Sequence, residues 1–129
     1  MIIEQYLDIA AFSQRVDGDI ELIIELYQLF LEDSKKLIAI IADSVERKDA
    51  ETLRASAHTL KGSSASISAW ALQDISSELE NMAIANNLSN ARSVRDKLFH
   101  CHEMTITEIQ SALVKLSRVP SVSGNETKA

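Results

Sequence analysis

Three residues suited to chemistry, His58, Lys61 and Gly62, lie in the segment AHTLKGSS at positions 57–64. Their spacings of three and four residues place them on one surface if the segment is helical. A neutral imidazole nitrogen is a nucleophile, and a nearby lysine can neutralise negative charge that arrives on the ring. A glycine inside an exposed helix costs about 1 kcal/mol relative to alanine, so its place here favours close approach of another protein. The pattern predicts a histidine that accepts a phosphoryl group from a protein partner.

The direction of His58 follows from helical geometry. At about 100° per residue, the apolar positions of this segment cluster on one side, and His58 points roughly 140° away from them. The predicted core residues of this helix are Leu53, Ala57, Leu60, Ser64 and Ile67. We therefore expect His58 to face solvent, with Arg54 and Ala65 on the same side.

The composition indicates which elements position these residues. The chain has 129 residues, 46% of them hydrophobic, with three glycines and one proline. These proportions predict an all-α fold with a real core. Apolar residues at steps of three and four predict a short helix around residues 2–10 and longer helices over 19–48, from 49 to about 66, around 72–82, and from about 88 to 116.

The lengths of the connections predict how these helices are arranged. Breaks are expected at residues 17–19, 66–69 and 86–89, and Ser89 is the predicted N-cap of the final helix. Short connections between helices of this length favour antiparallel neighbours. The sequence therefore predicts an antiparallel up-and-down four-helix bundle over residues 1–118, with a short N-terminal helix as a lid and a disordered C-terminal tail at 119–129.

The charge balance limits the class of partner. Thirteen basic and nineteen acidic side chains give a formal net charge of −6 at pH 7, which argues against nucleic acid or a membrane surface as the main partner. Cys101 is the single cysteine, so no internal disulfide is possible. The N-terminus lacks the basic region of a secretory signal, and no stretch of about eighteen residues is uninterruptedly apolar. We expect a cytoplasmic protein.

Nothing in the sequence predicts that the chain itself binds a nucleotide or a metal ion. It has no phosphate loop of the form GxxxxGK[ST] and no cluster of acidic metal ligands. The run HCHE at positions 100–103 has the residue types of a metal site, but consecutive helical residues point about 100° apart and cannot converge on one ion. Glu78 and Glu80 also diverge, which indicates a solvated charged face rather than acid–base catalysis.

Several residues that follow His58 form a recognisable pattern. They are the segment HTLKGSSASI at 58–67, then Ala69, Leu72, Leu79 and Glu80. With these residues and the predicted helix order, positions 1–118 resemble the histidine-containing phosphotransfer (HPt) domain of multistep two-component phosphorelays. The resemblance implies that His58 is the phosphoacceptor, that Lys61 is the charge partner of the phosphate, and that Gly62 leaves room for the partner protein.

The resemblance also implies the partners. Family members receive the phosphoryl group from an aspartate on a receiver domain, here that of a hybrid histidine kinase, and pass it to an aspartate on a second receiver domain, here that of a response regulator. The receiver brings the Mg²⁺ and most of the catalytic groups, so the chain is expected to bind no cofactor and to be a carrier, not an enzyme. Because the chain has enough helices to close a bundle alone, we expect a monomer.

One residue departs from the family pattern. Ser68 stands where the family usually has a glycine, ten residues after the histidine, and it is expected to alter the bend between two helices or the fit of the partner. The predicted partner contacts are Arg54, Ala55, Ala65, Ser66, Ser68 and Ala69. Ser68 also leaves open an alternative function, a receiver-binding module in which His58 is not phosphorylated.

Overall fold

The computed structural model describes residues 6–118, and within that range it contains helices and no strand. The helices are α1 (Ile9–Arg15), α2 (Ile20–Glu46), α3 (Ala50–Ser66), α4 (Trp70–Ile84) and α5 (Ala91–Ser117). The all-α prediction is confirmed. The predicted tail at 119–129 lies outside the described residues, as do residues 1–5. No helix of the described range is long and apolar enough to span a membrane.

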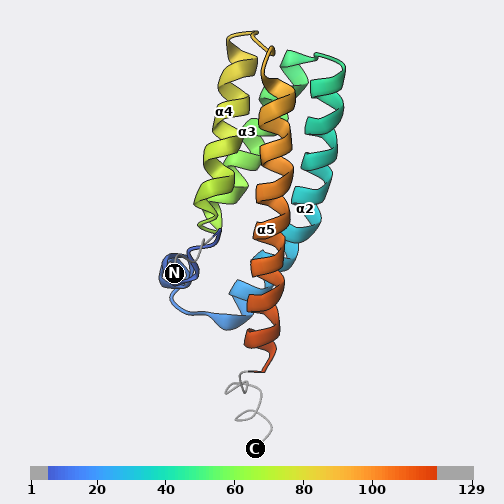
Figure 1. Cartoon of the computed structure of the whole chain (residues 1–129). Helices are drawn as coiled ribbons and strands as arrows, with labels where there is room; N and C mark the ends of the chain where they lie inside the picture. Colours follow the sequence, from blue (N-terminus) through green and yellow to red (C-terminus); the bar gives the residue numbers. More distant parts are fainter. Residues whose placement is uncertain (1–5, 119–129) are drawn as a thin grey trace, which may run out of the picture.

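The helices α2 to α5 form an up-and-down bundle in which each runs opposite to the one before it (Figure 1). α2 and α4 each pack beside both α3 and α5. α2 and α5 have 27 residues each, about 40 Å at 1.5 Å per residue, whereas α3 has 17 and α4 has 15. α1 lies at the end of the bundle where α3 connects to α4 (Figure 1). The predicted bundle with a short N-terminal helix is therefore confirmed.

The core face of α3 is the one expected from the apolar spacing, because all five predicted core side chains are buried. They are Leu53, Ala57, Leu60, Ser64 and Ile67. Leu72 and Leu79 of α4 and Leu98 of α5 are also fully buried. Since the buried side of α3 is set by these residues, its opposite side faces solvent along the whole helix.

Aspartate side chains begin three of the helices. Asp8, Asp19 and Asp49 each accept a hydrogen bond from the backbone N–H three residues later, at 3.0–3.1 Å. Each of these bonds provides an acceptor for a backbone N–H group of the first turn that has no hydrogen-bond partner within the helix. For α5 the N-cap is Asn90. The prediction of Ser89 is wrong, because its hydroxyl donates a hydrogen bond within the preceding loop instead.

Helix α1 begins later than the helix predicted around residues 2–10, of which residues 2–5 lie outside the described range. The backbone N–H groups of Tyr6 and Leu7 donate to the Glu108 carboxylate of α5 at 2.9 and 3.0 Å. The next N–H, that of Asp8, donates to the carbonyl oxygen of Ser68 at 2.9 Å. These long-range bonds hold the chain against α5 and the α3–α4 connection, so the helix begins only at Ile9.

Candidate functional site

His58 lies on the solvent side of α3, with 63% of its side chain exposed. The neighbouring side chains of Ala57 and Leu60 are fully buried, and they set the rotation of the helix. The prediction that His58 faces solvent is therefore confirmed. Its ring is open to a macromolecular partner.

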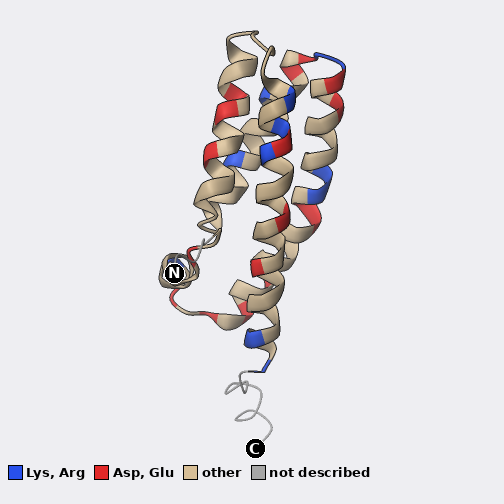
Figure 2. Ribbon diagram, viewed as in Figure 1, with Lys and Arg blue, Asp and Glu red and all other residues tan. Residues whose placement is uncertain are grey.

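Glu80 of α4 connects His58 to Lys61. Its Oε2 lies 2.8 Å from Nδ1 of His58, and its Oε1 lies 2.6 Å from Nζ of Lys61. Glu80 is only 7% exposed, so the interpretation that it belongs to a solvated charged face is wrong. The charged residues of α4 are all acidic (Figure 2). The antiparallel pairing of α3 with α4 places Glu80 beside Lys61 of α3.

The position of Glu80 follows from the helical hairpin. His58 and Glu80 are 22 residues apart and lie at equal distances in sequence from Ala69, within the connection between α3 and α4. Residues placed symmetrically about such a turn reach the same level of an antiparallel pair. Sequence reasoning missed this contact, and the symmetric spacing is the signal from which it was predictable.

The ionisation of Glu80 determines which nitrogen of His58 carries the proton. The ammonium group of Lys61 at 2.6 Å, and then the imidazole of His58, hold the pKa of the Glu80 carboxyl below its ordinary value against the opposing effect of burial. A carboxylate can only accept a hydrogen bond, so Nδ1 of His58 is assigned as the donor. In the neutral ring, Nε2 then carries the lone pair and is the nucleophilic atom.

The lowered pKa of Glu80 predicts an acid-sensitive contribution to stability. In the unfolded chain this carboxyl has its ordinary pKa of 4.5, so the unfolded state takes up the proton first as the pH falls. The stabilisation is complete above that value and is lost as the pH falls through the lower pKa of the folded state. We expect the free energy of unfolding to fall less in Glu80→Gln than in wild type as the pH is lowered below 4.5 and through the folded-state pKa of Glu80, measured by urea unfolding. Equal losses in the two proteins would contradict this.

Packing among residues 6–118 does not require a glycine at position 62. A Cβ atom added there would meet no atom within 4 Å apart from its chain neighbours and the nearby backbone of its own helix. Alanine therefore fits there, and the glycine is not required by packing within α3 or against its neighbours. Open space next to His58 is the property that this glycine provides.

On the His58 side of α3, Arg54 is a cation without an ionic partner among residues 6–118. Its side chain is exposed, and it forms no hydrogen bond or ion pair within residues 6–118. Lys61, by contrast, is already paired with Glu80. An incoming anionic group would therefore meet an unpaired guanidinium one turn before the histidine.

The predicted partner contacts divide into an accessible and an inaccessible set. Arg54, Ala55 and Ser66 are exposed and Ala65 is half-buried. Ser68 and Ala69 have no exposed surface, so the prediction that their side chains contact a partner is wrong. Both lie in the connection that returns the chain from α3 to α4, which turns them into the bundle.

The histidines and the cysteine of α5 do not form a metal site. Cys101 is buried, as expected, and Nε2 of His102 lies 2.8 Å from the hydroxyl oxygen of Ser34 on α2. Burial lowers the pKa of His102. Across residues 6–118, no group of three or more His, Cys, Asp or Glu side chains is arranged to hold a metal ion.

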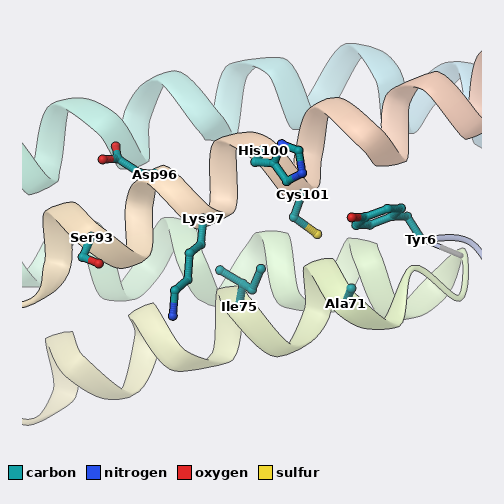
Figure 3. A pocket seen from close by; sticks show the side chains of 8 residues that line it. All are labelled: Tyr6, Ala71, Ile75, Ser93, Asp96, Lys97, His100 and Cys101. Atoms are coloured by element: carbon teal, nitrogen blue, oxygen red, sulfur yellow. The ribbon is translucent and has the colours of Figure 1, made fainter. Parts of the chain in front are cut away.

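A groove of about 790 Å³ lies elsewhere on the molecule. Its lining side chains are Tyr6, Ala71, Ile75, Ser93, Asp96, Lys97, His100 and Cys101 (Figure 3). They come from α4, α5 and the segment before α1, and His58, Glu80 and Lys61 are not among them. His58 therefore lies on an open helical surface rather than in this groove, and an open surface suits a protein partner better than a small substrate.

Comparisons with known proteins identify the family and the fold of the chain. The family model for the Hpt domain matches residues 25–117. The fold is similar to the crystal structure of histidine-containing phosphotransfer protein B (HptB) from Pseudomonas aeruginosa PAO1. The TM-score is 0.81 and the sequence identity is 20%, with 88% of this chain and 98% of that chain covered. Comparison with curated proteins finds no match. Because the family model matches most of this chain, the chain belongs to the family of Hpt domains, which are phosphotransfer carriers.

Proposed function

We propose that this Hpt domain is a phosphorelay intermediate that accepts a phosphoryl group on His58 from an aspartate of one receiver domain and passes it to an aspartate of another. The expected partners are the receiver domains of a hybrid histidine kinase and of a response regulator. The observation that carries the proposal is the contact of Glu80 with Nδ1 of His58, which leaves the lone pair of Nε2 on the exposed ring.

The proposed transfer step balances without a proton leaving the site. Nε2 of His58 attacks the phosphorus atom of the phosphoaspartate, an N–P bond forms, and the P–O bond to the aspartate breaks with release of its carboxylate. Positive charge develops on the imidazole ring, and the Glu80 carboxylate beside Nδ1 stabilises it. The Nδ1 proton stays in its hydrogen bond, so the same step runs in reverse toward the second receiver.

Lys61 has two roles in this proposal. Before transfer it is paired with Oε1 of Glu80 at 2.6 Å, which keeps that residue ionised. After transfer its flexible, partly exposed ammonium group can also approach the oxygens of the phosphoryl group. Mg²⁺ is expected on the partner receiver domain, and this chain is expected to bind no cofactor of its own.

We further propose that the chain is a carrier without turnover, acting as a monomer in the cytoplasm. The four long helices bury their apolar faces on one another, so a second copy is not needed to complete the core.

The direct test is transfer of labelled phosphate from a panel of phosphorylated receiver domains to the purified chain, with Mg²⁺ present. We expect loss of label from at least one receiver and an acid-labile, alkali-stable label on the chain. Binding of a phosphorylated receiver without any transfer would overturn the carrier proposal in favour of a receiver-binding module.

Two substitutions of Gly62 are expected to have different effects, one on the free energy of unfolding and the other on the rate of phosphoryl transfer. Gly62→Ala fits without a clash and removes the cost of glycine in a helix, so it should raise the free energy of unfolding by about 0.5–1 kcal/mol. Gly62→Gln should remain folded but slow transfer by about tenfold or more, because its side chain occupies the space beside His58. The matched control is Ser111→Gln, the same kind of enlargement at an exposed position of α5. Equal transfer by Gly62→Gln and the control would contradict this.

Arg54→Ala is expected to weaken association with the phosphorylated receiver. The unpaired guanidinium attracts the anionic phosphoaspartate, so its loss should reduce the association rate by about threefold to fivefold at low salt. The difference from wild type should shrink toward nothing near 1 M salt, where charges about 3 Å apart are already screened. Stopped-flow kinetics at several salt concentrations would measure this, with Lys115→Ala on α5 as the control. A defect that does not depend on salt would rule out the electrostatic role.

A further inference from the structure

Helix α1 packs on α2 through one apolar side chain and makes its polar contacts with the α3–α4 connection. Phe12 is the one buried residue of this seven-residue helix, and its ring centroid lies 5.0 Å from that of Tyr27. The polar contacts of α1 come from its two ends, Asp8 at the N-cap and Arg15 in the last turn. Both ends reach residues 65–70, which close α3 and begin α4.

Ser68 occupies a backbone conformation that favours glycine. Its φ is +61°, in the left-handed region where side chains are disfavoured. Its N–H donates to the carbonyl of Ala65 at 3.1 Å, and the N–H of Ala69 donates to the carbonyl of Ser64 at 2.9 Å. These two bonds end α3 in the manner of a glycine C-cap. The serine therefore carries a conformational cost that a glycine would not, and contacts of its side chain can offset that cost.

Arg15 supplies those contacts. Its Nη2 donates to the Ser68 hydroxyl oxygen, and its Nη1 donates to the carbonyl of Ala65 at 3.2 Å. Ser68 is fully buried, so its hydroxyl depends on a protein partner rather than on water. The guanidinium also lies 6.0 Å from the ring centroid of Trp70, and a cation is favourable at the carboxyl end of α3. We call this set, Arg15 with Ser68 and the Ala65 carbonyl, the Arg15 clamp.

The other end of α1 is tied to the same connection. The indole N–H of Trp70 donates to Oδ2 of Asp8 at 3.3 Å, and the N–H of Asp8 donates to the Ser68 carbonyl at 2.9 Å. Two separate attachments, one at each end of α1, therefore converge on one short segment. The position of α1 relative to α3 is determined there.

We propose that Arg15 is a positioning residue for phosphotransfer, because the Arg15 clamp fixes α1 beside the face of α3 that carries His58 and so completes the surface that the receiver domain recognises. Ala65 lies seven residues after His58, about 10 Å along the helix. Ile9 and Trp70 are apolar side chains at the clamped end of the bundle, and they are 45% and 44% exposed. Recognition of the receiver is part of the proposed function, so this inference rests on it.

The first test asks whether Arg15 stabilises the serine. Ser68→Gly removes both the unfavourable left-handed side chain and the hydroxyl that Arg15 binds. In wild type these effects oppose each other, so the melting temperature should stay the same or fall. In an Arg15→Ala background only the first effect remains, and Ser68→Gly should raise the melting temperature by about 3 °C. The same shift in both backgrounds would show that the two residues are not coupled and would overturn the clamp.

The second test asks whether the clamp serves transfer. Arg15→Ala should speed hydrogen exchange of the α1 amides by about tenfold while the α2–α5 amides are unchanged. The concentration of phosphorylated receiver that gives half-maximal transfer should rise by about fivefold, with the maximal rate within about twofold of wild type. Arg15→Lys keeps a hydrogen-bond donor at this position, so its half-maximal receiver concentration should lie between those of Arg15→Ala and wild type. Gln14→Ala, an exposed neighbour on α1, should resemble wild type in both measurements.

The outcomes distinguish this inference from the proposed function. If wild type accepts no phosphoryl group from any receiver, the proposed function fails, whatever the exchange data show. If wild type accepts it, the positioning role is overturned by α1 exchange in Arg15→Ala that matches wild type. It is also overturned by faster α1 exchange with an unchanged half-maximal receiver concentration.

Discussion

His58→Gln is expected to abolish acceptance of the phosphoryl group while the helical bundle stays folded. The glutamine amide has no nucleophilic nitrogen lone pair to replace Nε2, so no N–P bond can form. The side chain of His58 is 63% exposed, and Glu80 keeps its ion pair with Lys61. The free energy of unfolding should therefore change by no more than about 0.5 kcal/mol. Labelled phosphate transfer and urea unfolding would measure the two effects.

The matched control for this substitution is His100→Gln. His100 is an exposed histidine on α5 that lies along the groove of Figure 3 and not at the α3 surface. We expect it to accept phosphate at the wild-type rate. Label retained on His58→Gln, or lost from His100→Gln, would identify a different acceptor and refute the assignment of His58.

Glu80→Gln is expected to slow transfer by about 10-fold to 100-fold with little effect on receiver binding. The amide keeps the shape of the side chain but removes the negative charge that stabilises the developing imidazolium, and a hydrogen bond to a charged group is worth about 1.5–3 kcal/mol. Glu80 is only 7% exposed beneath His58 and Lys61, so it is not expected to touch the partner. The loss should appear in the maximal rate of single-turnover transfer and not in the half-maximal receiver concentration.

Glu78→Gln is the matched control for Glu80. Glu78→Gln removes one negative charge from the same helix. The Glu78 side chain, however, is exposed and has no hydrogen bond or ion pair in the described part of the chain. Its transfer rate should equal that of wild type. If the two variants slow transfer equally, the effect arises from the general charge of α4 and not from the contact with Nδ1.

The direction of His58 was predictable from the sequence because it depends on local periodicity alone. A helix repeats every 3.6 residues, so the apolar side chains of α3 determine its buried face, and the opposite face follows. The shared surface of His58, Lys61 and Gly62 has the same origin, as does the all-α fold, which follows from the scarcity of glycine and proline. The resemblance to the Hpt family likewise rests on residues near one another in the sequence, between His58 and Glu80, and on the helix order.

The tertiary structure alone decided the contacts between residues far apart in the sequence. Glu80 reaches His58 because α3 and α4 pack in one particular register, and a helical wheel of α4 shows only that Glu78 and Glu80 diverge. The burial of Ser68, its left-handed conformation and its bond to Arg15, 53 residues away, depend on how the α3–α4 connection folds back. The late start of α1 depends on Glu108, more than 100 residues away. Local spacing determines which face a residue occupies, whereas its partners across helices depend on packing register and connection geometry, which are properties of the assembled bundle.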